Sequence, residues 1–385
     1  MNEVLGTYAR PAVLIVDDDA KSSDHRLVDE LNNRGTTARL VHPAELTQEL
    51  LEGVLVVAAD HYLETWGQRD LAPTGQQVMD GIALCSVIRS VIEPAEDTRH
   101  SVQQVAYVVR TNKLELLRGS IPAKMSQHLL AAHFGLDWVH SKVNDNEGQL
   151  EADRLSALAR AVKSLPGDWH AVAPSESEQL AQWLGLAGAP FEAAALQQIE
   201  DCHPTAHRLA QQTSGSGFLR WFLHRVLPYP TFLVGDVRAA LALGMTLEAF
   251  EALVESESDA APDILAGEYV GHLRSFFGRR WWVAGLEAVA VQIRADQSRL
   301  STAIEAIGLD PGIHMHASRG LVVVLDGSLE PSGVPVPVGE AVRIQPDSWP
   351  SFADDAWTTI DAAVADPELR AIVVAADRER LPRAG

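Results

Sequence analysis

The chain has 385 residues, which is too many for one ordinary hydrophobic core, so two or three domains are expected. Hydrophobic residues make up 46% and charged residues 22%, a composition that is typical of a soluble globular protein and excludes a largely disordered one. The formal net charge of -21 repels nucleic-acid phosphates and disfavours nucleic acid as a partner.

Cysteine usage and hydropathy indicate a cytoplasmic protein. Cys85 and Cys202 are too few for a disulfide framework or a four-cysteine zinc site, which favours a reducing compartment. The apolar run near the N-terminus is short and ends in three aspartates, unlike a signal peptide or a membrane span. We therefore predict a cytoplasmic protein without membrane contact.

Strand and helix signals alternate strictly through the first 166 residues. Apolar runs predict strands at Val13–Val16, Thr37–Val41, Val54–Ala59, Val105–Val109 and Trp138–His140. Helical periodicity predicts helices at Ser23–Arg34, Glu45–Leu51, Gln77–Val91, Lys124–Phe134 and Glu151–Leu165. Such alternation is typical of an α/β domain with a parallel five-stranded sheet.

The remaining chain has a different character. Residues 167–307 are predicted to be mainly helical and to form an output or interaction domain. Residues 308–385 return to a mixed pattern and form a small α/β segment, which is either separate or part of that output domain. Within it we predict a strand at Leu321–Leu325, an edge strand or extended loop at Val334–Val338, a helix at Asp354–Ala365 and a strand at Ala371–Ala375.

Polar residues follow the predicted strands of the N-terminal domain. Asp17 and Asp18 follow the first strand, Asp60 the third, Thr111 the fourth and Lys142 the fifth. The carboxyl ends of parallel strands meet at one edge of a sheet, where they form a binding crevice. Three carboxylates suit Mg2+, and a carboxylate beside Mg2+ can attack a phosphoryl group. A hydroxyl and an ammonium can hold the remaining oxygens, so the pattern predicts a phosphoryl-transfer site.

Five segments of the N-terminal domain resemble the response-regulator receiver family of two-component signalling. They are Val13–Asp19, Val54–Asp60, Met79–Arg89, Val108–Thr111 and Gly135–Lys142. The resemblance covers residues 1–166 and implies a flavodoxin-like (βα)5 receiver domain. The C-terminal region resembles no family that we recognise.

The resemblance implies a role for each residue of the predicted site. Asp17 and Asp18, together with Asp60, hold Mg2+, and Asp60 accepts the phosphoryl group. Thr111 is the switch hydroxyl and Lys142 pairs with the phosphate. A histidine kinase or phosphotransfer protein is the implied donor, and dimerisation through the fourth-helix face is a family expectation.

Three features depart from the family pattern. The loop between Asp60 and Met79 is much longer than in a usual receiver, and Leu114–Pro122 reads as a further insert. Val143 follows Lys142, where the family usually has proline.

The C-terminal region offers two weaker signals. Val237–Val254 fits either a helix-turn-helix or an ordinary αα-hairpin, and Glu248 and Glu251 on the second helix favour the hairpin because they would repel DNA phosphates. The histidine pairs His203/His207 and His314/His316 have spacings that can bind a metal ion, although nothing in the sequence brings the pairs together.

Three functions remain open at this level. The first is a response regulator that is phosphorylated on Asp60 and signals through protein contacts of its C-terminal region. The second is a pseudo-receiver or phosphate sink that binds partners without a phosphorylation switch. The third is a receiver-regulated enzyme with a C-terminal active site, although no enzyme motif other than the receiver's own phosphoryl transfer is found.

Overall fold

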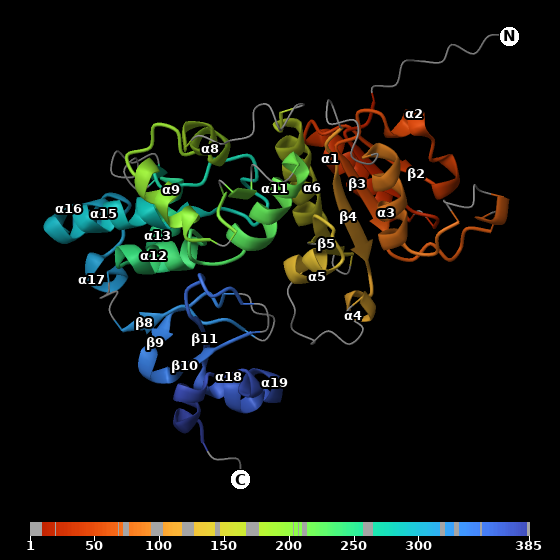
Figure 1. The fold of residues 1–385 in the computed structure, drawn as a ribbon. Helices are drawn as coiled ribbons and strands as arrows, with labels where there is room; N and C mark the ends of the chain where they lie inside the picture. Colours follow the sequence, from red (N-terminus) through yellow and green to blue (C-terminus); the bar gives the residue numbers. More distant parts are fainter. Residues whose placement is uncertain are drawn as a thin grey trace. The chain divides into compact units, whose positions relative to one another are not determined.

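A computed structural model describes most of the chain (Figure 1). The described residues are 10–19, 21–67, 69–71, 77–93, 103–117, 127–142, 147–166, 177–202, 204–206, 208–209, 214–256, 265–315, 320–326, 331–346 and 349–382. The chain forms two compact units. Unit 1 comprises Met1–Ile121, Gln127–Ser175 and Leu209–His224, and unit 2 comprises Pro122–Ser126, Glu176–Arg208 and Arg225–Gly385.

Unit 1 is built on a five-stranded sheet. Its strands are β1 (Val13–Val16), β2 (Ala38–Val41), β3 (Val56–Asp60), β4 (Ala106–Thr111) and β5 (Trp138–Ser141). They lie in the order β2-β1-β3-β4-β5, and all four pairings are parallel. This is the flavodoxin-like order, whose switch point lies between β1 and β3. The predicted fold class of the N-terminal domain is confirmed.

Helices flank this sheet (Figure 1). They are α1 (Ser22–Asn33), α2 (Gln48–Leu51), α3 (Gly81–Ile92), α4 (Leu114–Leu117), α5 (Gln127–His133), α6 (Glu147–Lys163) and α11 (Gly215–Trp221). Short 3-10 turns lie at Pro43–Glu45 and Arg69–Leu71. Five of the helices match the predicted ones within a few residues, whereas α4 lies in the segment that was interpreted as an insert.

Local signals explain where these elements begin and end. The four side chains of β1 are fully buried, as expected for a central strand that is covered on both faces. Helix α3 begins after Asp80, whose carboxylate accepts a hydrogen bond from the N–H of Ala83. Helices α1 and α5 end close to Gly35 and Gly135, whose φ angles of 75° and 66° favour glycine.

A segment from far along the chain completes unit 1. The hydroxyl and N–H of Ser216 in α11 donate to Oε1 of Gln104 at 2.7 and 2.9 Å. Arg220 lies 3.4 Å from the carboxylate of Asp137, and Nε2 of His224 lies 2.9 Å from the carbonyl oxygen of Asp137. Because Gln104 and Asp137 precede β4 and β5, this segment lies at the amino edge of the sheet. The compact unit therefore includes residues 209–224 in addition to the predicted domain.

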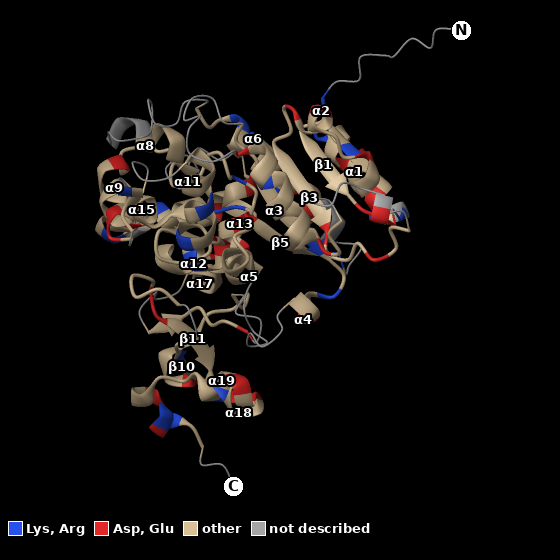
Figure 2. Cartoon of the chain, turned by 45° about the vertical axis from the view of Figure 1, so that its right-hand side comes forward, with Lys and Arg blue, Asp and Glu red and all other residues tan. Residues whose placement is uncertain are grey.

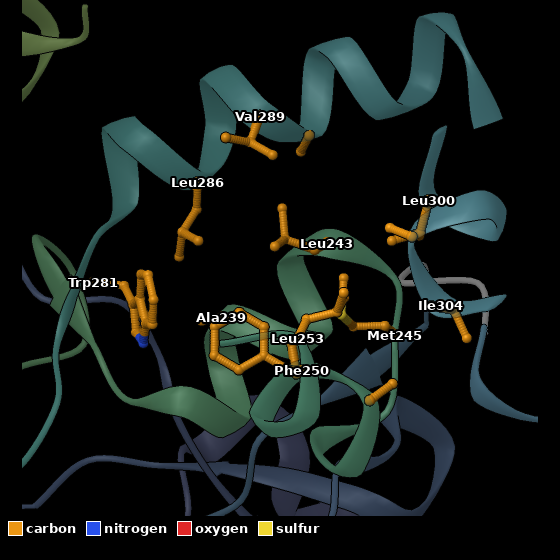
Figure 3. Packing of buried hydrophobic residues seen from close by; sticks show 14 of the residues in the cluster. Ala239, Leu243, Met245, Phe250, Leu253, Trp281, Leu286, Val289, Leu300 and Ile304 are labelled. Atoms are coloured by element: carbon orange, nitrogen blue, oxygen red, sulfur yellow. The ribbon is translucent and has the colours of Figure 1, made fainter. Parts of the chain in front are cut away.

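Unit 2 begins as the mainly helical region that was predicted. Its helices are α8 (Ser177–Leu184), α9 (Glu192–Glu200), α12 (Asp236–Leu243), α13 (Leu247–Glu255), α15 (Val283–Ala295), α16 (Gln297–Ala306) and α17 (Pro311–His314). Strands β6 (Leu233–Val234) and β7 (Trp281–Trp282) pair antiparallel, and a π-helix spans Phe222–Val226. Figure 3 shows the core, in which Leu286 and Val289 of α15 face Leu243 and Phe250 of α12 and α13.

The remaining elements form small two-stranded sheets. Strands β8 (Leu321–Val322) and β9 (Val336–Pro337) pair antiparallel, and so do β10 (Ala341–Ile344) and β11 (Ala356–Thr359). Helices α18 (Ile360–Ala365) and α19 (Pro367–Ala371) follow, and 3-10 turns lie at Val338–Glu340 and Ala375–Arg380. The region is a small α/β segment, as predicted.

Two predictions within this segment are wrong. The predicted helix at Asp354–Ala365 begins only at Ile360, because Ala356–Thr359 alternates buried and half-buried residues as a strand and Thr359 caps the helix. The predicted strand at Ala371–Ala375 does not form. Asp366 and Pro367 start α19, which runs to Ala371, and only Val373 makes an isolated bridge, with Ile344. A short apolar run does not distinguish a strand from a helix end.

Candidate phosphoryl-transfer site

Three carboxylates meet at the carboxyl edge of the sheet in unit 1. Asp17 and Asp18 directly follow β1, and Asp60 ends the neighbouring strand β3. One carboxylate oxygen from each residue lies within 4.8 Å of the others. Asp17 is buried, while Asp18 and Asp60 are half-buried. The sequence prediction that these three side chains lie close together is therefore borne out by the geometry.

Lys142 joins this acidic cluster from β5. Its Nζ donates to Oδ2 of Asp17 and contacts Oδ1 of Asp60, both at 2.8 Å. The backbone holds the residue at the sheet edge, since the N–H of Lys142 donates to the carbonyl oxygen of Thr111 at 2.7 Å. Lys142 thus reaches the cluster although Val143 replaces the usual proline.

Thr111 lies at the same edge but is not joined to the carboxylates. It ends β4 opposite Ser141 and is fully buried. Its hydroxyl oxygen accepts a hydrogen bond from the N–H of Lys113 at 3.1 Å. The structure therefore brings four of the five predicted residues together at one edge of the sheet and leaves Thr111 beside them.

The environment of Asp60 favours the protonated form of its carboxyl. Burial raises the pKa of Asp60 above its ordinary value, the Lys142 ammonium opposes this shift, and the Asp17 carboxylate adds to it. The next residue, His61, has a pKa below its usual range because burial outweighs the attraction of Asp80 and Asp60. A cation at this site would therefore favour the ionised, nucleophilic form of Asp60.

Gly81, the first residue of α3, lies close against the backbone of Asp60. A Cβ atom at this position would lie 2.3 Å from the carbonyl oxygen of Asp60, closer than any real contact. The N–H of Gly81 donates to the carbonyl oxygen of His61 at 3.0 Å. The start of α3 therefore packs directly on the backbone of the predicted phospho-acceptor, which a larger residue would displace.

A buried ionic network, whose residues were not among those predicted from the sequence, lies beneath the site. The Arg110 guanidinium donates to Glu151 of α6 through Nε and to Asp24 of α1 at 2.8 Å. Burial raises the pKa of Asp24 and Glu151, but the surrounding positive charges, of which Arg110 is the strongest, and hydrogen bonds together overcome this shift and hold both pKa values below their ordinary values. Nζ of Lys142 lies 3.9 Å from Asp24, so the network and the cluster share a lysine.

One signal in the sequence points to this network. Arg110 directly follows the apolar run of the predicted strand Val105–Val109 and precedes Thr111 of the predicted site. A buried arginine requires carboxylate partners, because an unpaired charge in the interior is costly. The partners, Asp24 and Glu151, lie 86 and 41 residues from Arg110 along the chain, and the sequence does not show which carboxylates these are.

The residues of the cluster fit a divalent cation. Mg2+ prefers oxygen ligands and keeps several waters, so three carboxylate oxygens at one edge are a suitable donor set. When ionised, three carboxylates and the Lys142 ammonium carry a net charge of -2, which matches a divalent ion. Among the described residues, this is the group of three or more His, Cys, Asp and Glu side chains arranged to hold a metal.

The two histidine pairs of the C-terminal region lie mostly outside the part of the chain that the structure describes. His203, His207 and His316 lie outside the described residues. His314 is described, and its Nδ1 lies 3.0 Å from the hydroxyl of Thr246. The metal-binding prediction for these histidines therefore stays a prediction.

Unit 2 contains a cavity of about 690 Å3. Residues of α12, α15, β8 and β11 line it, and its charged residues are Arg238, Glu287, Arg294, Asp354 and Asp355. The described lining contains no Ser, Cys, His or Lys, but it does contain the carboxylates of Glu287, Asp354 and Asp355, a residue type that can act in catalysis. The alternative of a C-terminal active site therefore stays a prediction.

Charged residues of both signs occur throughout the described chain. Figure 2 shows Lys and Arg interspersed with Asp and Glu along the ribbon of both units. The helical pair α12 and α13 turns at Gly244, and α13 carries Glu248 and Glu251. Within the described ranges, no helix is long and apolar enough to cross a membrane.

Comparisons of the chain with protein-family models, curated proteins and solved structures gave no match.

Proposed function

We propose that unit 1 is a phospho-acceptor domain of the receiver type in a two-component relay, and that Asp60 receives the phosphoryl group. One observation carries the proposal: the Lys142 ammonium contacts both Asp17 and Asp60 at 2.8 Å, beside Asp18, at the carboxyl edge of a sheet with the order β2-β1-β3-β4-β5. Five residues from four different strand ends supply the residue types that phosphoryl transfer requires.

The chemistry assigns a role to each side chain. A carboxylate oxygen of Asp60 forms a bond to phosphorus while the bond from phosphorus to the imidazole nitrogen of the donor breaks, and the bonding electron pair returns to that nitrogen. Lys142 then pairs with a phosphoryl oxygen in place of one of its present carboxylate partners. Mg2+, held by Asp17, Asp18 and Asp60, would neutralise charge on the transferring oxygens.

The output is proposed to be a protein contact rather than DNA binding. The net charge of -21 and the acidic face of α13 disfavour a nucleic-acid partner. Thr111 would turn toward the new phosphoryl group and alter the face that α5 and β5 form. The cytoplasmic location, the donor kinase and a homodimer through that face belong to the same proposal.

Phosphorylation with a small donor tests the proposal. The full-length protein is incubated with acetyl phosphate and MgCl2, and intact-mass spectrometry measures the fraction that gains one phosphoryl group. We expect one phosphoryl group on the wild type and none on Asp60→Asn. Asp19→Asn is the matched control, because Asp19 belongs to the same loop but is exposed and outside the cluster.

Each alternative function predicts a different outcome. A pseudo-receiver gains no phosphoryl group in any variant, and a Mg2+ titration then shows no binding. Equal phosphorylation of wild type and Asp60→Asn would place the acceptor elsewhere and overturn the proposal. A receiver-regulated enzyme with a metal centre in its C-terminal region predicts zinc, iron or manganese in elemental analysis of the purified protein.

A further inference from the structure

We infer that Thr65 is a positioning residue for the divalent cation site, because it holds one oxygen of Asp18 and so orients the carboxylate toward Asp17 and Asp60. This inference rests on the proposed phospho-acceptor function and adds a residue from the long loop that follows Asp60. No residue of that loop was among the predicted site residues.

Two hydrogen bonds from one residue reach the same carboxylate oxygen. The N–H of Thr65 donates to Oδ2 of Asp18 at 2.6 Å, and its hydroxyl donates to the same oxygen at 2.8 Å. Within the described part of the chain, Oδ1 of Asp18 accepts no hydrogen bond. One oxygen is thus used by the loop, and the other keeps its lone pairs for a cation.

The loop holds Thr65 in place from both sides. Leu63 is fully buried, and its N–H donates to the carbonyl oxygen of Met79 just before α3. Trp66 is only 4% exposed, and its ring packs edge-on against His42 at 5.8 Å between centroids. Because the buried side chains of Leu63 and Trp66 anchor the chain on either side of it, the exposed Thr65 is held in place as a donor.

Hydrogen bonds that hold the Asp18 carboxylate in position should raise the affinity of the site for a divalent cation. Hydrogen bonds to a carboxylate are charge-assisted and stronger than those between neutral groups. Groups that hold metal ligands in position typically change metal affinity 10- to 100-fold when they are mutated. Without the Thr65 hydroxyl, only the backbone N–H would hold the Asp18 carboxylate, and part of the binding free energy would be lost in ordering it.

The experiment measures Mg2+ affinity by isothermal titration calorimetry of the full-length protein with MgCl2. Thr65→Val removes the hydroxyl and keeps the size and the backbone N–H, so we expect Mg2+ to bind about 10-fold more weakly, at the lower end of the usual range. Thr65→Ser restores the hydroxyl and should recover most of the affinity. Thr37→Val is the matched control, because the Thr37 hydroxyl makes its hydrogen bonds before β2, at the opposite edge of the sheet.

The outcomes separate this inference from the proposed function. If wild type binds Mg2+ and Asp17→Asn does not, but Thr65→Val binds as tightly as wild type, then Thr65 has no positioning role and the proposed function stands. A wild type that binds no Mg2+ overturns both. Equal weakening by Thr65→Val and Thr65→Ser, with circular dichroism of native intensity, would show that the loop and not the hydroxyl matters, and would refute the inference.

Discussion

Replacing Arg110 should destabilise unit 1 more than any surface substitution. The side chain of Arg110 is 2% exposed and that of Asp24 is 1% exposed, so Arg110→Met leaves Asp24 and Glu151 charged in the interior without their main counter-ion. Removing one partner of a buried ion pair costs about 3–5 kcal/mol. For a unit of this size, that corresponds to a melting temperature lower by roughly 6–20 °C.

The penalty of Arg110→Met should depend on pH in a defined direction. In the wild type, Arg110, Lys142 and hydrogen bonds together hold the pKa values of Asp24 and Glu151 below their ordinary values. The stabilisation from these contacts is therefore present above the ordinary values and is lost as pH falls through the folded ones. In the variant, burial raises both pKa values, and the two acids take up protons more readily. The difference in stability between the two proteins should therefore shrink as pH falls toward the ordinary carboxyl pKa values of 4.5 and 3.8.

Hydrogen exchange measured by mass spectrometry on peptides from β3 and β4 reports on unit 1 alone. We expect protection to fall by about two to four orders of magnitude in Arg110→Met. Arg39→Met is the matched control, because Arg39 lies on β2 with a side chain that is 52% exposed and an ion pair to Glu45 that is worth at most about 1 kcal/mol. A loss below about 1 kcal/mol in Arg110→Met, or a loss that does not change with pH, would refute the reasoning.

Three further substitutions probe the site and its support. Gly81→Ala should destabilise unit 1 by about 1–3 kcal/mol in thermal unfolding, because the new Cβ would lie 2.3 Å from the Asp60 carbonyl oxygen; unchanged stability would contradict this. Lys142→Met should keep Mg2+ binding, since it removes only the ammonium, but should slow phosphoryl uptake about 100-fold in the mass assay; uptake at the wild-type rate would show that the ammonium is dispensable. Burial lowers the pKa of His224 to about 4, so the folded state gains no proton there as pH falls from 6.5 to 4 while the unfolded state does, and stability is lost over that window. His224→Gln should flatten this loss in pH-dependent unfolding, and an unchanged profile would exclude the histidine as its source.

The succession of strands and helices along unit 1 could be predicted from local sequence patterns. The apolar run Val13–Val16 matches β1 at both ends, because a central strand must be apolar on both faces and this requirement is visible in four adjacent residues. Asp17, Asp18 and Asp60 could be placed together for a different reason. Parallel strands bring their carboxyl ends to one edge of the sheet, regardless of how far apart the strands lie in the chain.

Local patterns did not give the correct type for two short elements of the C-terminal segment. Ala371–Ala375 was predicted to be a strand on composition alone, yet Asp366 and Pro367 start a helix that ends at Ala371. The strand at Ala356–Thr359 was hidden within a predicted helix, because its four residues are too few to separate a period of two from one of 3.6.

Only the tertiary structure shows the contacts between side chains that lie far apart in the sequence. Thr65 reaches Asp18 across 47 residues, and Arg220 reaches Asp137 across 83. Such pairings depend on how helices and loops pack onto the sheet, and no periodicity records them. The sequence by itself therefore determined the sheet and the acidic residues at its edge, whereas the folded chain decided which groups hold those residues in position.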